Sequence, residues 1–283
     1  MKRTAWGVFS CVAGLLFVGS QARLTAAITC TDADYNGHYA FSSVGELLQL
    51  PPAGAALLGT IAQSGRFDPD GKGNVPIETT VSYNGFITTG NTPGATYSVS
   101  PDCVITFYLT LPFPLSVPSQ FQGILSRDDQ QMVLMLTVPS GTVIIGQHIK
   151  QKISFCGLQD FSGAYQVELS GTISAPASLA GQFRRVGRLV ADGEGNFSAV
   201  TTADYNGKIV PEIFQGTYTV NSECFVTLTY TTGSGASAQT FTINGALGGN
   251  GEIAMVLVLN SGWGVAGTLR AQQGAAGEQL EIR

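Results

Sequence analysis

The sequence predicts an all-β protein made of two copies of one domain, each an eight-stranded antiparallel up-and-down barrel. Two observations support this. Short runs of alternating apolar and polar residues, bounded by Gly, Asn, Asp and Pro, fill the chain, and strong helix signals are absent. A set of motifs also occurs twice in the same order. Eight short strands with short connections can close into a barrel that has no free edge, and a two-sheet sandwich is the alternative.

Four motifs establish the duplication. Gly37–Phe41 returns as Gly163–Val167, Asp70–Asn74 as Asp192–Asn196, Tyr83–Gly85 as Tyr205–Gly207, and Tyr97–Val99 before Cys103 as Tyr218–Val220 before Cys224. The spacing between the two sets is nearly constant, which is typical of a duplicated domain. We expect the first repeat to cover 27–151 and the second to cover 152–272, followed by a flexible tail at 273–283.

The N-terminus indicates a secretory signal peptide over 1–22. Lys2 and Arg3 give it a positive start, and residues 6–19 form an uncharged, mostly apolar run that is too short to favour a membrane span. The small residues ending at Ala22 suit a signal peptidase, and cleavage after Ala27 is the alternative. We therefore expect an exported protein, periplasmic or extracellular, with no transmembrane segment in the mature chain.

Strand-like alternation recurs eight times in each repeat. Neighbours in sequence should pair antiparallel because the connections are short. The strands expected in the first repeat are 37–45, 59–67, 74–82, 94–99, 103–111, 120–126, 131–138 and 142–150. Those expected in the second are 163–171, 181–190, 196–204, 213–220, 224–232, 239–247, 252–260 and 263–271.

Removing the leader removes Cys11 and leaves four cysteines, an even number that favours disulfides in an exported protein. Each repeat has one cysteine before its first strand and one after its Tyr-x-Val motif. Pairing Cys30 with Cys103, and Cys156 with Cys224, is the one arrangement that treats both repeats alike. Each bridge would close a loop of about 70 residues, worth roughly 4 kcal/mol in the chain-entropy model. Four free thiols are the alternative.

The connections differ between the two ends of the predicted barrels. One end has tight polar turns, whereas the other has longer, Pro-rich and partly apolar loops at 47–58, 84–93 and 112–118, echoed at 175–179 and 209–214. An exposed apolar loop needs a cover or a partner. It is therefore a lid over a ligand or a plug over its own barrel. The candidate ligand-binding residues of these loops are Leu47, Leu48, Leu50, Leu57, Leu58, Phe113 and Leu115.

Four tyrosines occupy matching places in the two repeats: Tyr39, Tyr97, Tyr165 and Tyr218. As ligand-binding candidates, each would direct its hydroxyl into a cavity. The alternative is a core aromatic ring whose hydroxyl is hydrogen-bonded near the barrel rim.

Metal and catalytic signals are weak. Asp70–Asn74 gathers carboxylate and amide oxygens but lacks the later acid of a calcium-binding helix-loop-helix, so it predicts a hairpin turn. His38 and His148 could meet where the first and last strands pair, but Ala164 and Leu269 replace them in the second repeat, which favours two surface histidines. The sequence has no nucleophile elbow, zinc-protease motif or phosphate loop. We expect no cofactor, no metal site and no catalytic residue.

The charge balance restricts the partners. The chain has 14 Lys and Arg against 19 Asp and Glu, a formal net charge of −5. An acidic protein is a poor fit to nucleic acid or to an anionic membrane surface. Charged residues make up only 12% of the chain, which is typical of an exported β protein with a polar but mostly uncharged surface.

The repeated motifs also carry a resemblance. With the leader, the segments Gly37–Phe41, Asp70–Asn74 and Gly94–Cys103, and their second copies Gly163–Val167, Asp192–Asn196 and Gly216–Cys224, resemble a group of uncharacterised exported bacterial tandem-repeat proteins. That group looks like small calycin-type barrels, the architecture shared by lipocalins and allene oxide cyclases. The resemblance implies barrels that can hold one small apolar ligand. Its motifs mark a fold and not an activity.

Three functions remain open from the sequence. The first is a secreted, non-catalytic module that binds a small apolar ligand at the end bearing the apolar loops. The second is a structural or surface-interaction protein whose barrels are filled by their own side chains. The third is a cofactor-free isomerase or cyclase, which needs an inward-facing acid–base group in an apolar pocket.

Overall fold

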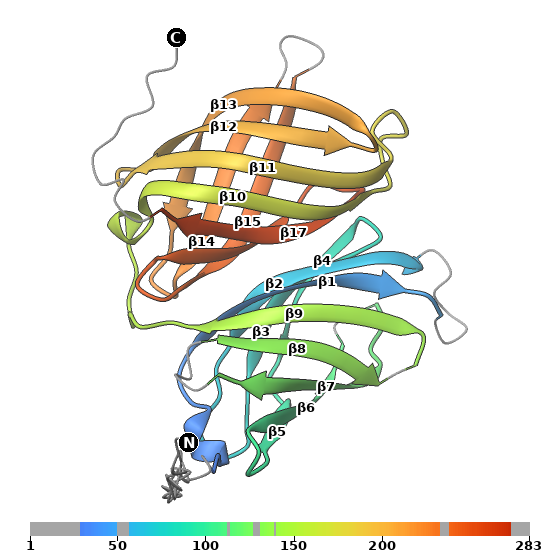
Figure 1. Cartoon of the computed structure of the whole chain (residues 1–283), viewed down its shortest axis with the longest axis vertical. Coiled ribbons are helices and arrows are strands. Elements are labelled where there is room, and N and C mark those ends of the chain that lie inside the picture. The colour runs from blue at the N-terminus through green and yellow to red at the C-terminus, as the bar shows by residue number, and fades with distance from the viewer. Residues whose placement is uncertain are drawn as a thin grey trace, which may run out of the picture.

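The computed structural model describes residues 29–49, 57–111, 114–126, 131–138, 140–232 and 238–272. It is an all-β structure in which each repeat forms its own antiparallel sheet, and the two curled sheets lie one above the other (Figure 1). The predicted signal peptide and the predicted tail at 273–283 lie outside the described residues. Within the described ranges, the helical segments are single 3₁₀ turns, so none of them has the length or apolar character of a membrane span.

The second repeat is a closed barrel in the strand order β10-β11-β12-β13-β14-β15-β16-β17, which confirms the predicted architecture for this half. Its strands are β10 (Ser162–Ile173), β11 (Gly181–Asp192), β12 (Asn196–Tyr205), β13 (Lys208–Val220), β14 (Phe225–Thr232), β15 (Gln239–Gly248), β16 (Ile253–Val258) and β17 (Trp263–Ala271).

The first repeat is a curled nine-stranded sheet in the order β4-β3-β2-β1-β9-β8-β7-β6-β5. Its strands are β1 (Tyr39–Leu47), β2 (Gly59–Phe67), β3 (Ile77–Tyr83), β4 (Phe86–Thr92), β5 (Thr96–Val99), β6 (Val104–Thr110), β7 (Pro118–Leu125), β8 (Gln131–Val138) and β9 (Thr142–Lys150). The prediction of a second closed, eight-stranded barrel is therefore wrong for this half.

The difference arises where β13 of the second repeat is replaced by β4 and β5. The strand is interrupted between Thr92, which ends β4, and Thr96, which begins β5. The short strand β5 then pairs with β6. The backbone closes the sheet at the end of the tight turns, where Val75 N donates to Ala95 O (3.0 Å) and Tyr97 N to Gly73 O (2.9 Å). Among the described residues, no ladder joins β4 to β6. The first sheet is thus closed at one end only.

Residues 84–93 and 209–214 were expected to be loops, but 86–92 and 209–214 lie in strands. Asn84 and Gly85 have φ of 48° and 87°, and Asn206 and Gly207 have φ of 51° and 92°. Two consecutive positive φ values are those of a type I′ turn, which joins two strands through two residues and favours Asn-Gly. The Asn-Gly pairs therefore form tight hairpins from β3 to β4 and from β12 to β13. Pro93 and Pro211 had obscured this hairpin signal, because proline is rare inside a strand.

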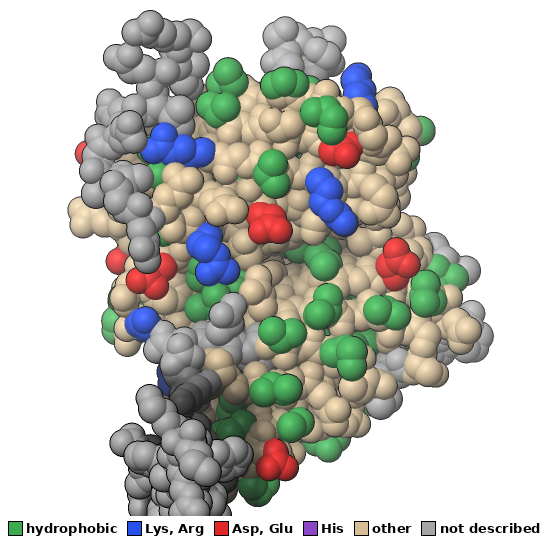
Figure 2. All heavy atoms as spheres, viewed as in Figure 1, with side chains coloured by type: hydrophobic (Ala, Val, Ile, Leu, Met, Phe, Trp, Pro, Cys, Tyr) green, Lys and Arg blue, Asp and Glu red, His purple; other side chains and the backbone are tan. Residues whose placement is uncertain are grey.

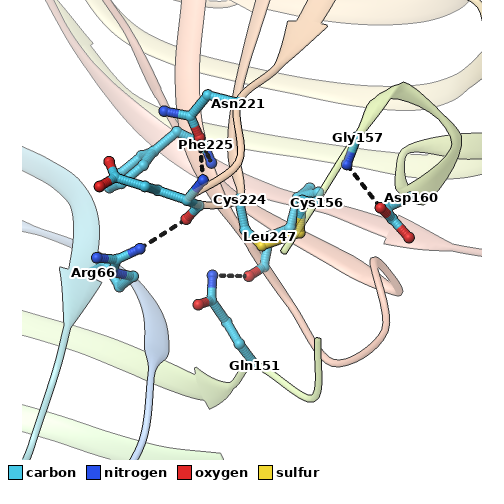
Figure 3. Close-up of a disulfide and its surroundings, with 10 residues drawn as sticks. Arg66, Gln151, Cys156, Gly157, Asp160, Asn221, Cys224, Phe225 and Leu247 are labelled. Carbon is cyan, nitrogen blue, oxygen red and sulfur yellow. Dashed lines mark hydrogen bonds between the residues drawn. A yellow bond between two sulfur atoms is a disulfide. The ribbon is translucent and has the colours of Figure 1, made fainter. Parts of the chain in front are cut away.

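Both predicted disulfides are present. Cys30 is bonded to Cys103 and Cys156 to Cys224, with Cα–Cα distances of 5.0 and 4.9 Å. In each repeat a short 3₁₀ turn follows the first cysteine, η1 (Asp32–Asp34) and η3 (Leu158–Asp160). Figure 3 shows the second bridge beside the 3₁₀ turn, where Gly157 N donates to Asp160 Oδ2 (2.8 Å). The bridges fix these entry segments across the tight-turn ends of the sheets.

The two domains pack through the outer faces of their sheets. Outward side chains of β1 and β2 meet outward side chains of β15, β16 and β17 in two small apolar clusters. The described members of these clusters are Ala40, Val44, Ala62, Ile149, Phe225, Ala246, Ile253, Met255, Leu257, Leu259 and Ala266. Every residue of β16 is buried, because its inner face lies in the barrel core and its outer face lies against the first domain. Both faces of this strand are therefore part of packed cores.

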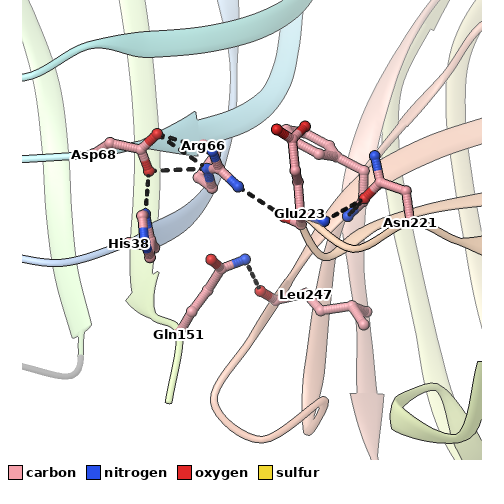
Figure 4. Close-up of polar contacts among 8 residues, drawn as sticks. His38, Arg66, Asp68, Gln151, Asn221, Glu223 and Leu247 are labelled. Carbon is pink, nitrogen blue, oxygen red and sulfur yellow. Dashed lines mark hydrogen bonds and ion pairs between the residues drawn. The ribbon is translucent and has the colours of Figure 1, made fainter. Parts of the chain in front are cut away.

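Hydrogen bonds add to this contact. Ser64 Oγ donates to Met255 O (2.6 Å) and Ser82 Oγ to Trp263 O (2.8 Å). Arg66 binds Asp68 within its own domain and donates through Nη1 to Glu223 O (2.9 Å) in the other, as Figure 4 shows. These donors reach backbone carbonyls of the second domain. The contact therefore depends on where that backbone lies rather than on the identity of its side chains.

The backbones of the two domains come into direct contact at two glycines. A Cβ atom on Gly85 would lie 2.3 Å from Gly262 Cα, and Gly262 N donates to Gly85 O (3.0 Å). Gly207 is the counterpart of Gly85 in the second Asn-Gly turn, and a Cβ atom there would meet nothing within 4 Å. The second turn therefore provides a control with the same backbone conformation and no neighbour.

We predict that Gly85→Ala destabilises the protein much more than Gly207→Ala. Both substitutions place alanine at positive φ, which costs about 1 kcal/mol. Only Gly85→Ala also forces two backbones apart, and such overpacking costs roughly 1–3 kcal/mol more. Urea unfolding of both variants measures the difference. Equal destabilisation would show that the domains do not pack at this contact.

Candidate functional site

Both domain interiors are filled by side chains. The cavity inside the first domain has a volume of about 30 Å³ and that inside the second about 20 Å³. A buried water needs roughly 10–15 Å³, whereas pockets for drug-sized ligands have roughly 300–1,000 Å³. The first cavity is lined by Phe41, Ser43, Gln63, Phe67, Ile77, Thr79, Thr92, Phe107, Leu109, Leu111, Phe121, Leu134, Ile144 and Gly146. Each interior thus has room for a water or two.

The predicted ligand-binding leucines do not form one group. Leu47 is buried at the end of β1, whereas Leu48 is 57% exposed. Leu57, Leu58 and Leu115 are half-buried and pack against the first core. Leu50 and Phe113 lie outside the described residues. The described leucines therefore behave mainly as a cover over their own core, and binding of a ligand by them stays a prediction.

The four recurring tyrosines lie toward the tight-turn end, away from the leucines. Tyr97 donates its hydroxyl hydrogen bond to Tyr35 O (2.7 Å), Tyr165 to Gly251 O (3.0 Å) and Tyr218 to Leu158 O (3.2 Å). Tyr39 is buried at the start of β1, whereas Leu47 ends this strand. Burial raises the pKa of Tyr97, Tyr165 and Tyr218, so these hydroxyls stay protonated at neutral pH. Their hydrogen bonds to backbone carbonyls stabilise the tight-turn end of each domain, which we call its floor.

One polar pair in the first core was missed by sequence reasoning. His148 is fully buried among the rings of Phe41, Phe67 and Phe107, with its Nδ1 3.1 Å from Tyr35 Oη. The prediction that His148 lies on the surface is wrong, because its strand position points inward. His38 has an exposed side chain, and its Nδ1 contacts Asp68 Oδ1 at 2.6 Å (Figure 4). The two histidines thus have different partners.

Burial lowers the pKa of His148 to about 3, so its ring is neutral at neutral pH. Its Nε2 has no hydrogen-bond partner among the described residues. The register aligns Tyr35 and His148 with Phe161 and Leu269 of the second repeat. That domain builds the same place from apolar side chains alone. The pair is therefore a feature of the first core and not a requirement of the fold.

The second core contains a buried ion pair. Arg185 Nη2 donates to Glu212 Oε2 and Arg185 Nη1 to Tyr230 Oη, both at 2.7 Å, and Tyr205 Oη donates to Glu212 Oε1 at 2.7 Å. Arg185 is 2% exposed and also lies over the rings of Phe183, Phe214 and Tyr230. Arg185, Phe214 and Tyr230 line a cavity of only about 20 Å³. The carboxylate of Glu212, the acidic group in this core, is paired with Arg185.

The most distinctive exposed feature is on the outer face of β7, β8 and β9. Five apolar side chains on this outer face, Ile124, Val133, Met135, Val143 and Ile145, are each 56–64% exposed, and we call them the apolar face. The uncharged side chains of Gln122 and Gln147 lie beside them. None of residues 118–125, 131–138 and 142–149 is Asp, Glu, Lys or Arg. Figure 2 shows hydrophobic side chains gathered on this side of the lower domain, below the hollow between the domains. Exposed apolar patches of this kind mark interaction sites.

A groove adjoins the apolar face where the two domains meet. It has a volume of about 310 Å³ and is lined from the first domain by Val44, Val133 and Ile145, and from the second by Glu168, Ala266 and Thr268, among others. Val44 pairs with Ile145 across β1 and β9. The apolar face is therefore continuous with the contact between the domains.

The sequence motifs gave no signal for this face, but the register of the two repeats explains it. Leu125 N donates to Cys103 O as Leu247 N donates to Cys224 O, so β7 is equivalent to β15. Ile124 pairs with Val133 as Ala246 pairs with Met255, and Met135 pairs with Ile145 as Leu257 pairs with Ala266. The positions of the apolar face in the first repeat are thus those that bind the first domain in the second repeat.

Comparison with known proteins gives little further guidance. No family model matches the chain, and no curated protein matches it. Among solved structures, the chain is similar to the crystal structure of the isotype 1 transferrin binding protein B from serogroup B Neisseria meningitidis, with a TM-score of 0.34 and 8% identity over 83% of this chain and 74% of that one. A likeness this low supports no conclusion about function. Among the described residues, no three His, Cys, Asp or Glu side chains are grouped as metal ligands.

We predict that His148 makes the protein less stable as the pH falls below 6.5. The pKa of His148 is about 3 in the folded protein and 6.5 in an unfolded chain. Between these pH values the unfolded chain binds a proton at His148 and the folded protein does not. The free energy of unfolding should fall by at most ~1.4 kcal/mol per pH unit between these two values. The double variant Tyr35→Phe/His148→Leu copies the second repeat and should lose this slope. Urea midpoints measured over the pH unit just below 6.5 provide the test.

His38→Gln is the control, because it removes the exposed histidine and leaves the core intact. A double variant with the same pH slope as the unsubstituted protein would show that His148 titrates normally.

Proposed function

We propose that this protein is an exported, non-catalytic interaction module that presents the apolar face to a protein partner. The leader predicted from the sequence and the two disulfides support export, because disulfides persist in oxidising compartments. The proposal places the protein in the periplasm or outside the cell.

The observation that carries the proposal is a difference between equivalent positions of the two repeats. Ala246, Met255, Leu257 and Ala266 of the second repeat are buried against the first domain, and their counterparts in the first repeat are large, apolar and exposed. A sheet face that binds a partner in one repeat is suited to bind one in the other. The filled interiors also favour an outer surface over an inner pocket as the functional site.

We predict that a photo-crosslinking amino acid placed at Ile145 or Met135 joins the protein to a partner in the cell that exports it. The same amino acid at Ile209, which is 62% exposed on the second domain, is the matched control. Discrete products at the two test positions and none at the control are expected, because only the apolar face should be covered. Equal labelling at all three positions, or at none, would contradict the proposal.

A second candidate is the binding of a small apolar ligand inside the first domain. It is favoured by the separation of β4 from β6, which leaves this sheet able to widen, and by the mainly apolar cavity lining. Leu47, Leu57 and Leu58 would then cover the ligand. The third possibility, an isomerase, has no comparable support because Glu212 is held by Arg185.

We predict that the purified protein gives no saturable response to a fluorescent fatty acid, because a cavity of about 30 Å³ cannot hold an acyl chain. Fluorescence titration of the unsubstituted protein and of Leu134→Phe makes the measurement. Leu134 lines the cavity, so the larger side chain would fill it further. A saturable response that Leu134→Phe abolishes would instead establish the second candidate.

A further inference from the structure

We infer that the partner of the apolar face is a second copy of this chain, joined face to face about a two-fold axis. This inference rests on the proposed function, because it names the occupant of the same surface. The starting observation is that the two domains of one chain meet in an unsymmetrical way. The β1–β3 side of the first repeat contacts the β15–β17 side of the second, and β15–β17 are the counterparts of β7–β9.

An unsymmetrical contact leaves one face of each domain free. The first domain retains its β7–β9 face, and the second retains its β10–β12 face. If these free faces matched as the internal ones do, successive chains would add head to tail into an open filament.

The second free face is unsuited to that role. At the positions of Ser42, Ala62 and Ser82, which are buried against the second domain, the second repeat has Glu168, Arg184 and Asp204. Arg184 and Asp204 are neighbours across β11 and β12, but Glu168 would meet no opposite charge on the uncharged apolar face. Burying the three charges there would also desolvate them, which costs several kcal/mol for each ion. Head-to-tail addition is therefore blocked by the residues of the second domain.

Pairing of the apolar face with itself buries no charged side chain of the three strands that form it, although exposed Glu46 of β1 borders the face beside Val143. Residues 118–125, 131–138 and 142–149 carry no Asp, Glu, Lys or Arg, so two acidic copies can bring these strands together without apposing like charges. The outward side chains lie on three adjacent strands with β8 in the middle. A two-fold axis through such a face buries the same side chains from both copies, and two-fold dimers are the commonest oligomers.

The face is also adjacent to an existing apolar contact. Val44 and Ala62 pack against Leu257 and Ala266 in the internal interface, and Val44 pairs with Ile145 at its border. A second copy would extend this buried layer from β1 across β9 and β8 to β7. Sheets packed face to face lie about 10 Å apart, a distance that side chains of the size of Ile, Val and Met fill.

We predict that the purified protein is a dimer and that charge on the apolar face separates it. The acidic form Val133→Asp/Ile145→Asp and the basic form Val133→Lys/Ile145→Lys should each weaken dimerisation about tenfold or more, because like charges then oppose each other in a desolvated contact. An equimolar mixture of the two forms should restore the dimer, because a self-paired face apposes acid to base. Sedimentation velocity measures the mass in each case.

The control is Val200→Asp/Ile213→Asp, a cross-strand pair of exposed residues on the second domain that should leave the dimer unchanged. Thermal unfolding confirms that every variant folds; the substituted positions on the apolar face are 57% and 56% exposed in the single chain. A monomer at all concentrations, or a dimer that persists in both charged forms, would overturn the inference. Failure of the mixture to pair would overturn two-fold symmetry. Crosslinks from Ile145 to a different protein would overturn the inference and still support the proposed function.

Discussion

The structure depends on burying both faces of the sheets where the two domains meet. A strand in a barrel normally buries one face and exposes the other. In β16, and over most of β1 and β2, both faces are buried, so outward positions must carry small or apolar side chains. Ala40, Ser42, Ala62 and Ser64 satisfy this condition, and the serines at 64 and 82 donate to backbone carbonyls of the other domain. Because one contact joins two glycine backbones, the relative position of the domains is set by main chain as well as side chain.

Comparison of equivalent positions shows how the repeats have diverged. Both keep the disulfide, the 3₁₀ turn, the Asp-Gly-x-Gly-Asn turn and the tyrosines of the floor, which together fix one end of each domain. In the turns, Asp70 and Asp192 accept hydrogen bonds from the backbone and side chain of Asn74 and Asn196. The interiors differ: the second has the Arg185–Glu212 ion pair, and the first has His148 with Tyr35. A buried ion pair is weak grounds for stability, because desolvation offsets much of the attraction. Its clearest consequence here is to occupy the space that a ligand would need.

Sequence reasoning identified the all-β class and the disulfide pairing, because the first depends on patterns local in the chain and the second on the repetition of motifs. It missed β4 and the first part of β13, although the Asn-Gly pairs that create their hairpins were visible as repeated motifs. It also placed His148 on the surface, because one residue of register decides whether a strand side chain points inward. The apolar face was not recognised, because apolar side chains occur on both sides of these strands. Which side points inward is known only once the strand pairing is known.

The sequence by itself determined two disulfide-bonded β domains, because turn residues, alternation and cysteines act through neighbours close along the chain or through the repeat. Only the tertiary structure decided that the first sheet is closed at one end, that the interiors are filled, and which outer face is buried and which is exposed. Those outcomes depend on contacts between residues far apart in sequence. Ile145 and Ala266 occupy equivalent positions, yet one is exposed and the other is buried, because only the second has the other domain against it.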